Sequence, residues 1–272
     1  MIEWSNDRMV EWSKVGGFTL VRRLKIRGET EVWQATRDAD GIAVALKIAP
    51  SGAPDAVRLR REEAALSRVV SRSTVALAGF SEAGGRLLLA LDWCRGGTIK
   101  ERLAAEGAFS VHVVRDVAWR LLLALRDVHS ADIIHRDLKP GNIFLTELNE
   151  PRLGDFGIAL LPGERAKRGV VVGSAAYMSP EQAIGGRLDA RSDLYSLGLV
   201  LHELATGRQV FDGADFAAKL HRAATEAVPF LSTVAPDVPV SFARFIGSLT
   251  ERDRALRPAS AVEALLILKD AL

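Results

Sequence analysis

The stretch His135-Arg136-Asp137-Leu138-Lys139-Pro140-Gly141-Asn142, followed downstream by Asp155-Phe156-Gly157, decides the fold of this chain. Residues 143–153, between the two motifs, are expected to form a hairpin, so that two carboxylates, a carboxamide and a lysine would stand on two joined loops. Asn142 and Asp155 offer hard oxygen ligands of the kind that Mg²⁺ binds. Asp137 can accept a proton from a hydroxyl group, and Lys139 can neutralise a phosphoryl group during transfer.

This order of residues resembles the catalytic loop and the magnesium loop of eukaryotic-type Ser/Thr protein kinases, including the bacterial ones. By that resemblance Asp137 is the catalytic base, Lys139 contacts the γ-phosphate, and Asn142 and Asp155 hold magnesium. A lysine at position 139 is the form of the loop found in Ser/Thr rather than Tyr kinases. A loop that only ties the lobe together by salt bridges explains the pattern less well, because all eight positions fall in order.

The resemblance also implies a lysine that grips the α- and β-phosphates of ATP. Val44-Ala45-Leu46-Lys47 is similar to the strand that carries it. Its partner is expected on the following helix, where both Glu62 and Glu63 qualify by residue type. Glu62 is preferred because Leu66 and Val69, one and two helical turns further on, would then share its inward face.

The adenine site is expected, by resemblance, at Leu91-Asp92-Trp93-Cys94. The backbone of Asp92 and Cys94 would bond the base, Leu91 would be the gatekeeper, and the Cys94 thiol is expected to have no chemical role. Phe144 is expected beneath the adenine, which would make the pocket tight. The remaining predicted nucleotide contacts are Leu24, Val32 and Ala45.

Further positions of the C-terminal half match the supports of a kinase activation segment. Ser179-Pro180-Glu181 is similar to the end of that segment, and Arg257 is the expected ion-pair partner of its glutamate. Asp193 is expected to cap the backbone of the catalytic loop. Ser174 stands where the family usually has threonine, and its hydroxyl group is predicted to bond the catalytic aspartate and lysine.

The loop that covers the phosphates departs from the family pattern. Lys25, Arg27 and Thr30, in the run KIRGETE between Leu24 and Val32, stand where the three glycines are expected. Glycine matters there because the backbone must approach phosphate closely and adopt positive φ in places. Either side chains replace the backbone amides as phosphate ligands, or nucleotide binding has been lost.

The predicted activation segment lacks the usual site of regulation. Arg136 is typical of kinases in which a phosphate on this segment pairs with that arginine. Residues 158–172, IALLPGERAKRGVVV, contain no Ser, Thr or Tyr. Glu164 is the only acid in the run, so it is predicted to offer Arg136 a permanent negative partner; the alternative is a mobile loop with a solvated arginine. Activity is therefore expected without phosphorylation of this loop.

The wider pattern predicts an α+β fold with two unlike lobes, because strand-like runs come first and helices follow. A five-stranded antiparallel sheet with one helix, Val57–Val70, would precede a mainly helical lobe, as in the bilobal protein kinase fold. Strands are predicted at 18–24, 31–37, 43–48, 74–80 and 86–91, and helices at 98–106, 111–129, 193–206, 214–224, 240–249 and 259–271. The predicted domains are an N-terminal extension at 1–17, an N-lobe at 18–91, a hinge at 92–98 and a C-lobe at 99–272.

The composition of the chain bears on its expected partners and on the compartment in which it works. The 272 residues carry 36 Lys+Arg against 34 Asp+Glu, a formal net charge of +2, which argues against nucleic acid or an anionic membrane as the main partner. Cys94 is the single cysteine and cannot form an internal disulfide, so a reducing compartment is expected. No run of apolar residues is long enough to span a bilayer. A cytoplasmic globular protein is predicted.

The combined prediction is an ATP- and Mg²⁺-dependent Ser/Thr protein kinase with an unknown protein substrate and a regulatory partner. The degenerate loop motivates a second hypothesis, a pseudokinase that serves as a binding module. Small-molecule kinases of the aminoglycoside or choline type share the base and metal loops. They lack the activation segment and its anchors, so Glu181, Asp193 and Arg257 argue against that third hypothesis.

Overall fold

The computed structural model describes residues 14–271, so that most of the N-terminal extension predicted at 1–17 lies outside the described residues. The described chain forms two compact units. One consists of residues 14–59 and Leu77–Trp93, and the other of Arg60–Ala76 and residues 94–271. Strands dominate the first unit and helices the second, which confirms the predicted α+β class.

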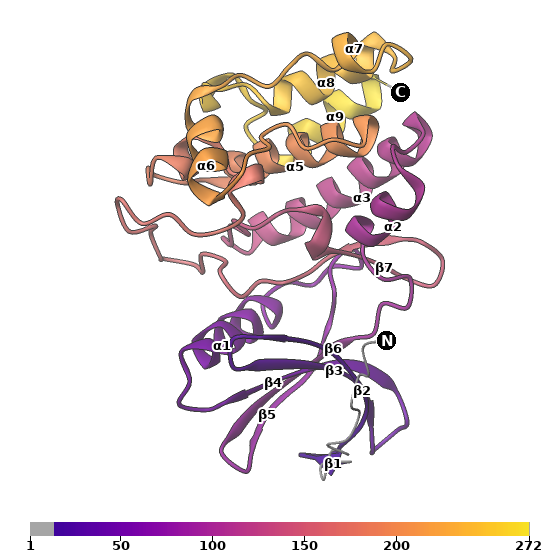
Figure 1. The fold of residues 1–272 in the computed structure, drawn as a ribbon, viewed down its shortest axis with the longest axis vertical. Helices are drawn as coiled ribbons and strands as arrows, with labels where there is room; N and C mark the ends of the chain where they lie inside the picture. Colours follow the sequence, from indigo (N-terminus) through magenta and orange to yellow (C-terminus); the bar gives the residue numbers. More distant parts are fainter. Residues whose placement is uncertain (1–13, 272) are drawn as a thin grey trace, which may run out of the picture. The chain divides into compact units, whose positions relative to one another are not determined.

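The first unit is built on an antiparallel sheet with the strand order β1-β2-β3-β4-β6-β5 (Figure 1). The five predicted strands are present, and the two-residue β1 adds a sixth that is too short for its residues to show any alternation. Thr74 was expected to begin a strand of this sheet, but it belongs to the second unit, where it bridges Leu153 and the Val75 N–H donates to the Leu153 carbonyl. The strands are β1 (Lys14–Val15), β2 (Phe18–Arg27), β3 (Thr30–Arg37), β4 (Ala43–Pro50), β5 (Leu77–Ala83) and β6 (Arg86–Asp92).

Alternation along β4 separates a core face from a second face. Val44, Leu46 and Ile48 are buried in the hydrophobic core of the sheet. Ala45 and Lys47, the alternate residues, therefore share the opposite face of the strand. The period of two thus places the predicted phosphate-binding lysine on the same side as Ala45.

The run KIRGETE forms a tight β-hairpin rather than an open loop. Pairing between β2 and β3 continues to Arg27 and Thr30, which leaves a turn of Gly28 and Glu29. Gly28 adopts φ +57°, a backbone conformation that glycine reaches without steric cost. The Glu29 N–H donates to Asp55 Oδ2 at 2.9 Å, so the tip of the hairpin is bonded to the first turn of the helix that follows β4.

That helix, α1 (Pro54–Leu66), begins and ends earlier in the chain than the predicted Val57–Val70. The Arg68 N–H donates to the Ala65 carbonyl, and this tighter spacing closes the last turn. Val70, predicted as the last residue of the helix, lies beyond its end and is 94% exposed.

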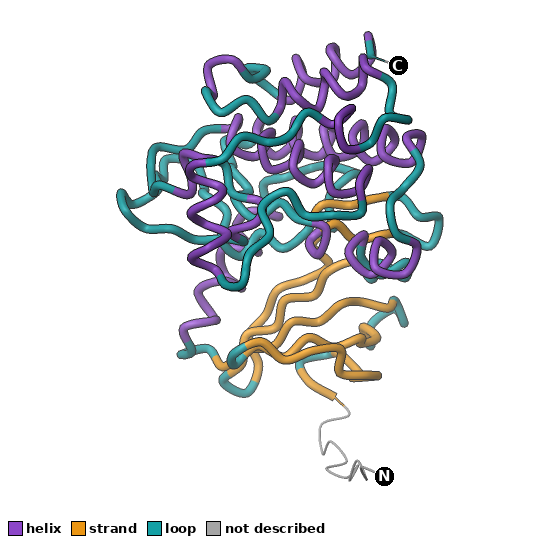
Figure 2. The backbone as a smooth tube through the Cα atoms, turned by 45° about the horizontal axis from the view of Figure 1, so that its top comes forward, coloured by secondary structure: helices purple, strands orange, loops and turns teal. Residues whose placement is uncertain are grey.

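The second unit is mainly helical (Figure 2). Its helices are α2 (Ile99–Glu106), α3 (Val111–Ser130), α4 (Pro180–Ala183), α5 (Ala190–Thr206), α6 (Phe216–Thr225), α7 (Leu231–Val234), α8 (Val240–Leu249) and α9 (Ala261–Asp270). The predicted hairpin between the two motifs is present as β7 (Ile143–Leu145) and β8 (Pro151–Leu153). Short 3₁₀ turns occupy Pro140–Asn142, Ala175–Tyr177 and Arg254–Leu256.

The core of this unit is centred on α3 and α5, which contact each other. The buried part of α5 runs without interruption from Ser192 to Leu204, as expected for a helix surrounded by protein. The helix begins before the predicted Asp193 because the Asp189 carboxylate caps it by accepting the Arg191 N–H. Asp193 therefore lies in the first turn of a buried helix. Within residues 14–271, every helix is too short or too polar to cross a bilayer.

Candidate active site

Asp193 holds the catalytic loop by its backbone. Its carboxylate accepts the N–H of His135 at 2.8 Å and that of Arg136 at 2.9 Å, and His129 Nε2 lies 2.9 Å from the same carboxylate. Burial alone would raise the pKa of Asp193, but the bond to His129 and the backbone amide outweigh it and hold that pKa below its ordinary value. Arg136 adopts φ +66°, which is unfavourable for a side chain of this size. The predicted capping role of Asp193 is confirmed.

Asp137 is buried and its two carboxylate oxygens differ. Oδ2 accepts hydrogen bonds from Lys139 Nζ at 2.7 Å and from Asn142 Nδ2 at 3.0 Å. Oδ1 is also buried, and it has no hydrogen-bond partner among the described residues. A buried polar atom left in this way costs about 1–3 kcal/mol, and such atoms in folded proteins often have a functional explanation. The bonds to Oδ2 therefore fix the carboxylate, while Oδ1 is left without a bond within the described residues.

Lys139 connects the catalytic loop to the activation segment. Its Nζ donates to Ser174 Oγ at 2.7 Å as well as to Asp137. The predicted bond between the Ser174 hydroxyl and Lys139 is therefore present, whereas Ser174 is linked to Asp137 only through the lysine, which bonds both side chains.

Asn142 and Asp155 are linked through the backbone. Asn142 Nδ2 also donates to the Asp137 carbonyl at 2.8 Å, which leaves the side-chain oxygen of Asn142 as the atom suited to a metal. The N–H of Gly154, next to Asp155, donates to the Asn142 carbonyl at 2.9 Å. One amide oxygen and one carboxylate fit Mg²⁺, which binds through a few protein groups together with phosphate oxygens.

The residues predicted to contact nucleotide are divided between the two units. Register pairs Lys47 with Val32 and Ala45 with Leu91, so these four share one face of the sheet. Leu24 lies at an irregularity in the pairing of β2 with β3. These residues, together with Asp92 at the end of β6, belong to the sheet unit.

The helical unit holds the others. Glu62 is 2% exposed and Glu63 is only half-buried, which supports the preference for Glu62 as the inward residue of the helix. Cys94 is buried. Phe144 packs so closely on Gly154 that a Cβ there would lie 2.9 Å from its ring.

The activation segment has partners that sequence reasoning assigned wrongly. Glu164 forms its ion pair with Arg61 of α1 and not with Arg136. Arg136 donates from Nε to the Ile158 carbonyl at 2.6 Å, and its Nη2 bonds the same oxygen. Burial and the neighbouring Arg61 cation both lower the pKa of Arg136. The arginine is thus half-buried and bonded to backbone, so the alternative of a solvated side chain is also wrong.

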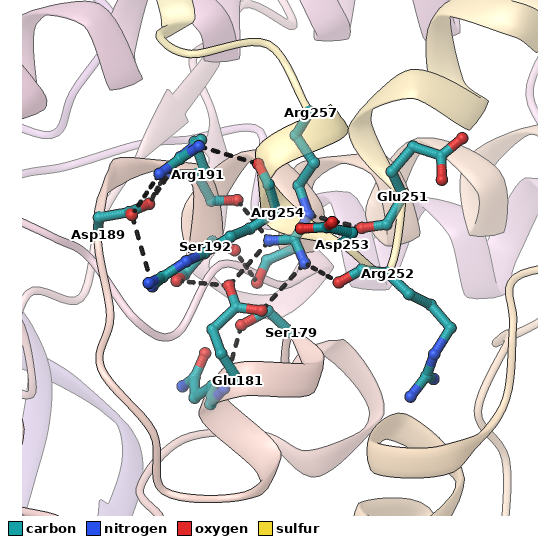
Figure 3. Close-up of polar contacts among 12 residues, drawn as sticks. Ser179, Glu181, Asp189, Arg191, Ser192, Glu251, Arg252, Asp253, Arg254 and Arg257 are labelled. Carbon is teal, nitrogen blue, oxygen red and sulfur yellow. Dashed lines mark hydrogen bonds and ion pairs between the residues drawn. The ribbon is translucent and has the colours of Figure 1, made fainter.

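Glu181, at the end of the activation segment, and Arg257 form the predicted ion pair (Figure 3). The bond is bidentate, with Nη1–Oε1 at 2.8 Å and Nη2–Oε2 at 3.0 Å. The guanidinium also lies over the Tyr195 ring, 4.7 Å from its centroid. Burial alone would raise the pKa of Glu181, but Arg257 outweighs it and holds that pKa below its ordinary value. The pair is expected to be ionised at neutral pH.

Gln182 is a support that sequence reasoning missed. Its Nε2 donates to the Arg136 carbonyl at 2.8 Å and to the Val172 carbonyl at 3.0 Å, so it ties the catalytic loop to the activation segment. Its position directly after Ser179-Pro180-Glu181 was only a weak indication of this role, because a single glutamine forms no pattern from which its hydrogen-bond acceptors could be predicted. Arg61 was missed for the same reason.

Comparisons with known proteins give the chain a family. A model of the protein kinase domain matches residues 27–266. The serine/threonine-protein kinase PknL of Mycobacterium tuberculosis is 35% identical over 207 residues, which cover 75% of this chain and 52% of the relative. The DNA damage-responsive serine/threonine-protein kinase RqkA of Deinococcus radiodurans is 35% identical over 253 residues, with 90% and 38% covered. The serine/threonine-protein kinase pkn2 of Myxococcus xanthus is 34% identical over 275 residues, with 94% and 32% covered. The chain spans about half the length of PknL and less of the other two.

Replacing Glu181 by Gln should strongly destabilise the helical unit. The substitution preserves the size of the side chain but leaves the Arg257 cation buried without a counter-charge, and breaking such a pair costs about 3–5 kcal/mol. Glu106→Gln, which removes an exposed ion pair with Arg102, should cost less than about 1 kcal/mol. Denaturant unfolding at neutral pH measures both.

The same experiment at low pH gives the sign of the linkage. The pKa of Glu181 is lowered in the folded state, so its stabilisation is fully present above the ordinary glutamate pKa and is lost as the pH falls through the lowered value. The difference between wild type and Glu181→Gln should therefore shrink in acid. Equal stability of the two proteins at neutral pH would contradict a structural role for the pair.

Proposed function

Because the chain belongs to the protein kinase domain family, whose model matches residues 27–266, we propose that it transfers the γ-phosphoryl group of ATP to a Ser or Thr hydroxyl of a protein substrate. The observation that carries the proposal is the Oδ1 atom of Asp137, which has no hydrogen-bond partner within residues 14–271. A buried carboxylate with one oxygen fixed by Lys139 and Asn142, and the other unpartnered, is suited to accept a proton from a hydroxyl group.

In the transfer step the acceptor O–H bond breaks and its proton passes to Asp137 Oδ1. The acceptor oxygen forms a bond to the γ-phosphorus, the bond to the bridging oxygen breaks, and ADP leaves with the electron pair. Lys139, which is held by Asp137 and Ser174, supplies positive charge to the transferring group. Mg²⁺ bound at Asn142 and Asp155 would neutralise charge on the phosphates.

For the nucleotide, we propose that Lys47 contacts the α- and β-phosphates with Glu62 as its partner. Adenine would lie among Val32, Ala45 and Leu91, whose shared face of the sheet supports this assignment. The remaining proposed contacts are Leu24, the backbone of Asp92 and Cys94, and the Phe144 ring. The extension at 1–17, the lobes at 18–91 and 99–272 and the hinge at 92–98 are part of the same proposal.

The tight hairpin motivates a second candidate function, a binding module without catalysis. Its turn has one glycine at positive φ and is bonded to Asp55, so its amides are arranged differently from those of a glycine-rich loop. Lys25 and Arg27, which lie on β2 beside this turn, have the charge to replace amide contacts to phosphate. We favour catalysis because Lys47, Asp137, Lys139, Asn142 and Asp155 are all present.

For the setting of the reaction, we propose a reducing compartment, the cytoplasm, on the basis of the single cysteine. The near-neutral charge balance gives no reason to invoke nucleic acid as a partner. A regulatory protein partner remains part of the proposal.

Replacing Asp137 by Asn should lower phosphoryl transfer by about 10²–10⁴-fold, because the variant keeps the shape of the side chain and loses its basicity. Transfer is measured with labelled ATP, Mg²⁺ and a Ser/Thr-containing acceptor protein. Asp132→Asn is the matched control, since Asp132 is exposed and lies at φ +56°, a conformation that asparagine tolerates.

The outcomes of this experiment separate the two functions. Equal transfer by wild type and Asp137→Asn would reject the proposed base. Binding of ATP in a calorimetric titration, with no transfer by the wild type, would establish the binding module instead.

Activity should not need phosphorylation of the activation segment. Residues 158–172 contain no acceptor hydroxyl, and Arg136 already bonds a backbone carbonyl in that segment. We therefore expect protein that is co-expressed with a phosphatase to be as active as untreated protein, with mass spectrometry confirming that phosphate has been removed. A large loss of activity that follows loss of phosphate from another site in the chain would refute this.

A further inference from the structure

The part of the activation segment that follows Phe156 is attached to α1 by one pair of side chains. Arg61 Nη2 donates to Glu164 Oε1 at 3.1 Å, and Arg61 Nη1 bonds the other carboxylate oxygen. Two nitrogens of one guanidinium therefore meet the two oxygens of one carboxylate. This parallel arrangement fixes orientation as well as distance.

Each member of the pair also bonds the backbone of the segment. Arg61 Nη1 donates to the Ala159 carbonyl at 2.8 Å. Glu164 Oε2 accepts the Leu161 N–H at 3.0 Å, and the Glu164 N–H donates to the Leu161 carbonyl at 2.9 Å. The pair thus closes the turn from Leu161 to Glu164 and holds the residue before Leu160 at the same time.

These bonds continue into the catalytic loop. The Leu160 N–H donates to the Ile134 carbonyl at 2.8 Å, and the Ile134 N–H donates back to the Leu160 carbonyl at 3.1 Å. Ile134 directly precedes His135, whose N–H is bonded to Asp193. A continuous series of contacts therefore runs from α1 through the segment to the loop that carries Asp137.

The charges around Glu164 make it hard to replace. It is the only acid in residues 158–172, where Arg165, Lys167 and Arg168 follow it. The hydrogen bond from Arg61 lowers the pKa of Glu164, so the carboxylate remains charged at neutral pH. Without that charge, Arg61 and the nearby Arg136, which already repel each other, would lack the anion that compensates them.

We propose that Arg61 and Glu164 are a positioning pair for phosphoryl transfer, in which a permanent carboxylate keeps the activation segment and α1 in the arrangement needed for the reaction. The inference rests on the proposed kinase function. The two side chains are 26% and 38% exposed, and an ion pair at that exposure contributes little by charge alone. Its effect comes from the bidentate geometry and the three backbone bonds, which fix the segment beside Ile134 and the helix beside Glu62.

A double-mutant cycle tests the proposal, with Arg61→Gln, Glu164→Gln and the double variant. We expect each single substitution to lower kcat by about fivefold, with little change in KM for ATP, because neither residue is among the proposed nucleotide contacts. The double variant should lose less than the two single losses combined, since the bond between the two side chains is absent from all three variants. Arg58→Gln, an exposed arginine on the same helix, and Glu147→Gln, an exposed acid of the helical unit, are the controls and should match wild type.

Trypsin supplies a readout that does not depend on activity. Trypsin cleaves after the basic residues that follow Glu164, which are Arg165, Lys167 and Arg168. Loss of the Arg61–Glu164 pair should open this part of the segment, so cleavage should be faster in both single variants and unchanged in the controls. If wild type transfers phosphate, additive losses in the cycle, or unchanged kcat whatever the cleavage rate, would overturn the positioning role. If wild type transfers no phosphate, the proposed function fails. Faster cleavage in the single variants would then still support attachment of the segment by the Arg61–Glu164 pair, and unchanged cleavage would contradict it.

Discussion

The buried carboxylate of Asp193 is the constraint on which the site depends. A catalytic loop must turn sharply to present Asp137, and the turn places Arg136 at φ +66°, where a bulky residue is strained. Two amide hydrogens of that turn would be left without partners if nothing accepted them. Asp193 accepts both from the first turn of α5, a helix that is fixed by the core of the unit. The packing of α5 in the core therefore stabilises the strained backbone conformation of Arg136, through the two bonds to Asp193.

Other contacts extend this support outward. Gln182 holds the Arg136 carbonyl, and the Glu181–Arg257 pair holds the short helix from which Gln182 projects. On the other side, Leu160 pairs with Ile134 just before the turn. The loop is thus bonded to Gln182, to Asp193 and, through Ile134, to Leu160. In the sheet unit, the pairing of the strands alone brings four of the proposed nucleotide contacts to one face. No side-chain contact is required for that arrangement.

The sequence predicts well what depends on local pattern and poorly what depends on distant partners. Short strand-like runs separated by turn residues predicted the strands of the sheet. The motif at 135–142 predicted the catalytic loop and the residues that bond there, because their short spacing dictates their geometry. The sequence could not give the partner of Glu164, since charge alone does not distinguish Arg61 from Arg136. Nor could it give Gln182, whose acceptors are backbone carbonyls far away in the sequence. Proposed contacts with ATP rest on resemblance to the family and on register, and they remain proposals.

The most direct test of this account is the kcat of an Asp193→Asn variant with saturating ATP and Mg²⁺. Asparagine keeps one acceptor oxygen but loses the charge and turns an N–H group toward a backbone N–H, so at least one bond to the turn is lost. Because an unsatisfied buried amide costs about 1–3 kcal/mol, kcat should fall by about tenfold or more in protein that near-ultraviolet circular dichroism shows to be folded. A folded variant that retains the wild-type kcat would contradict the dependence of the site on Asp193.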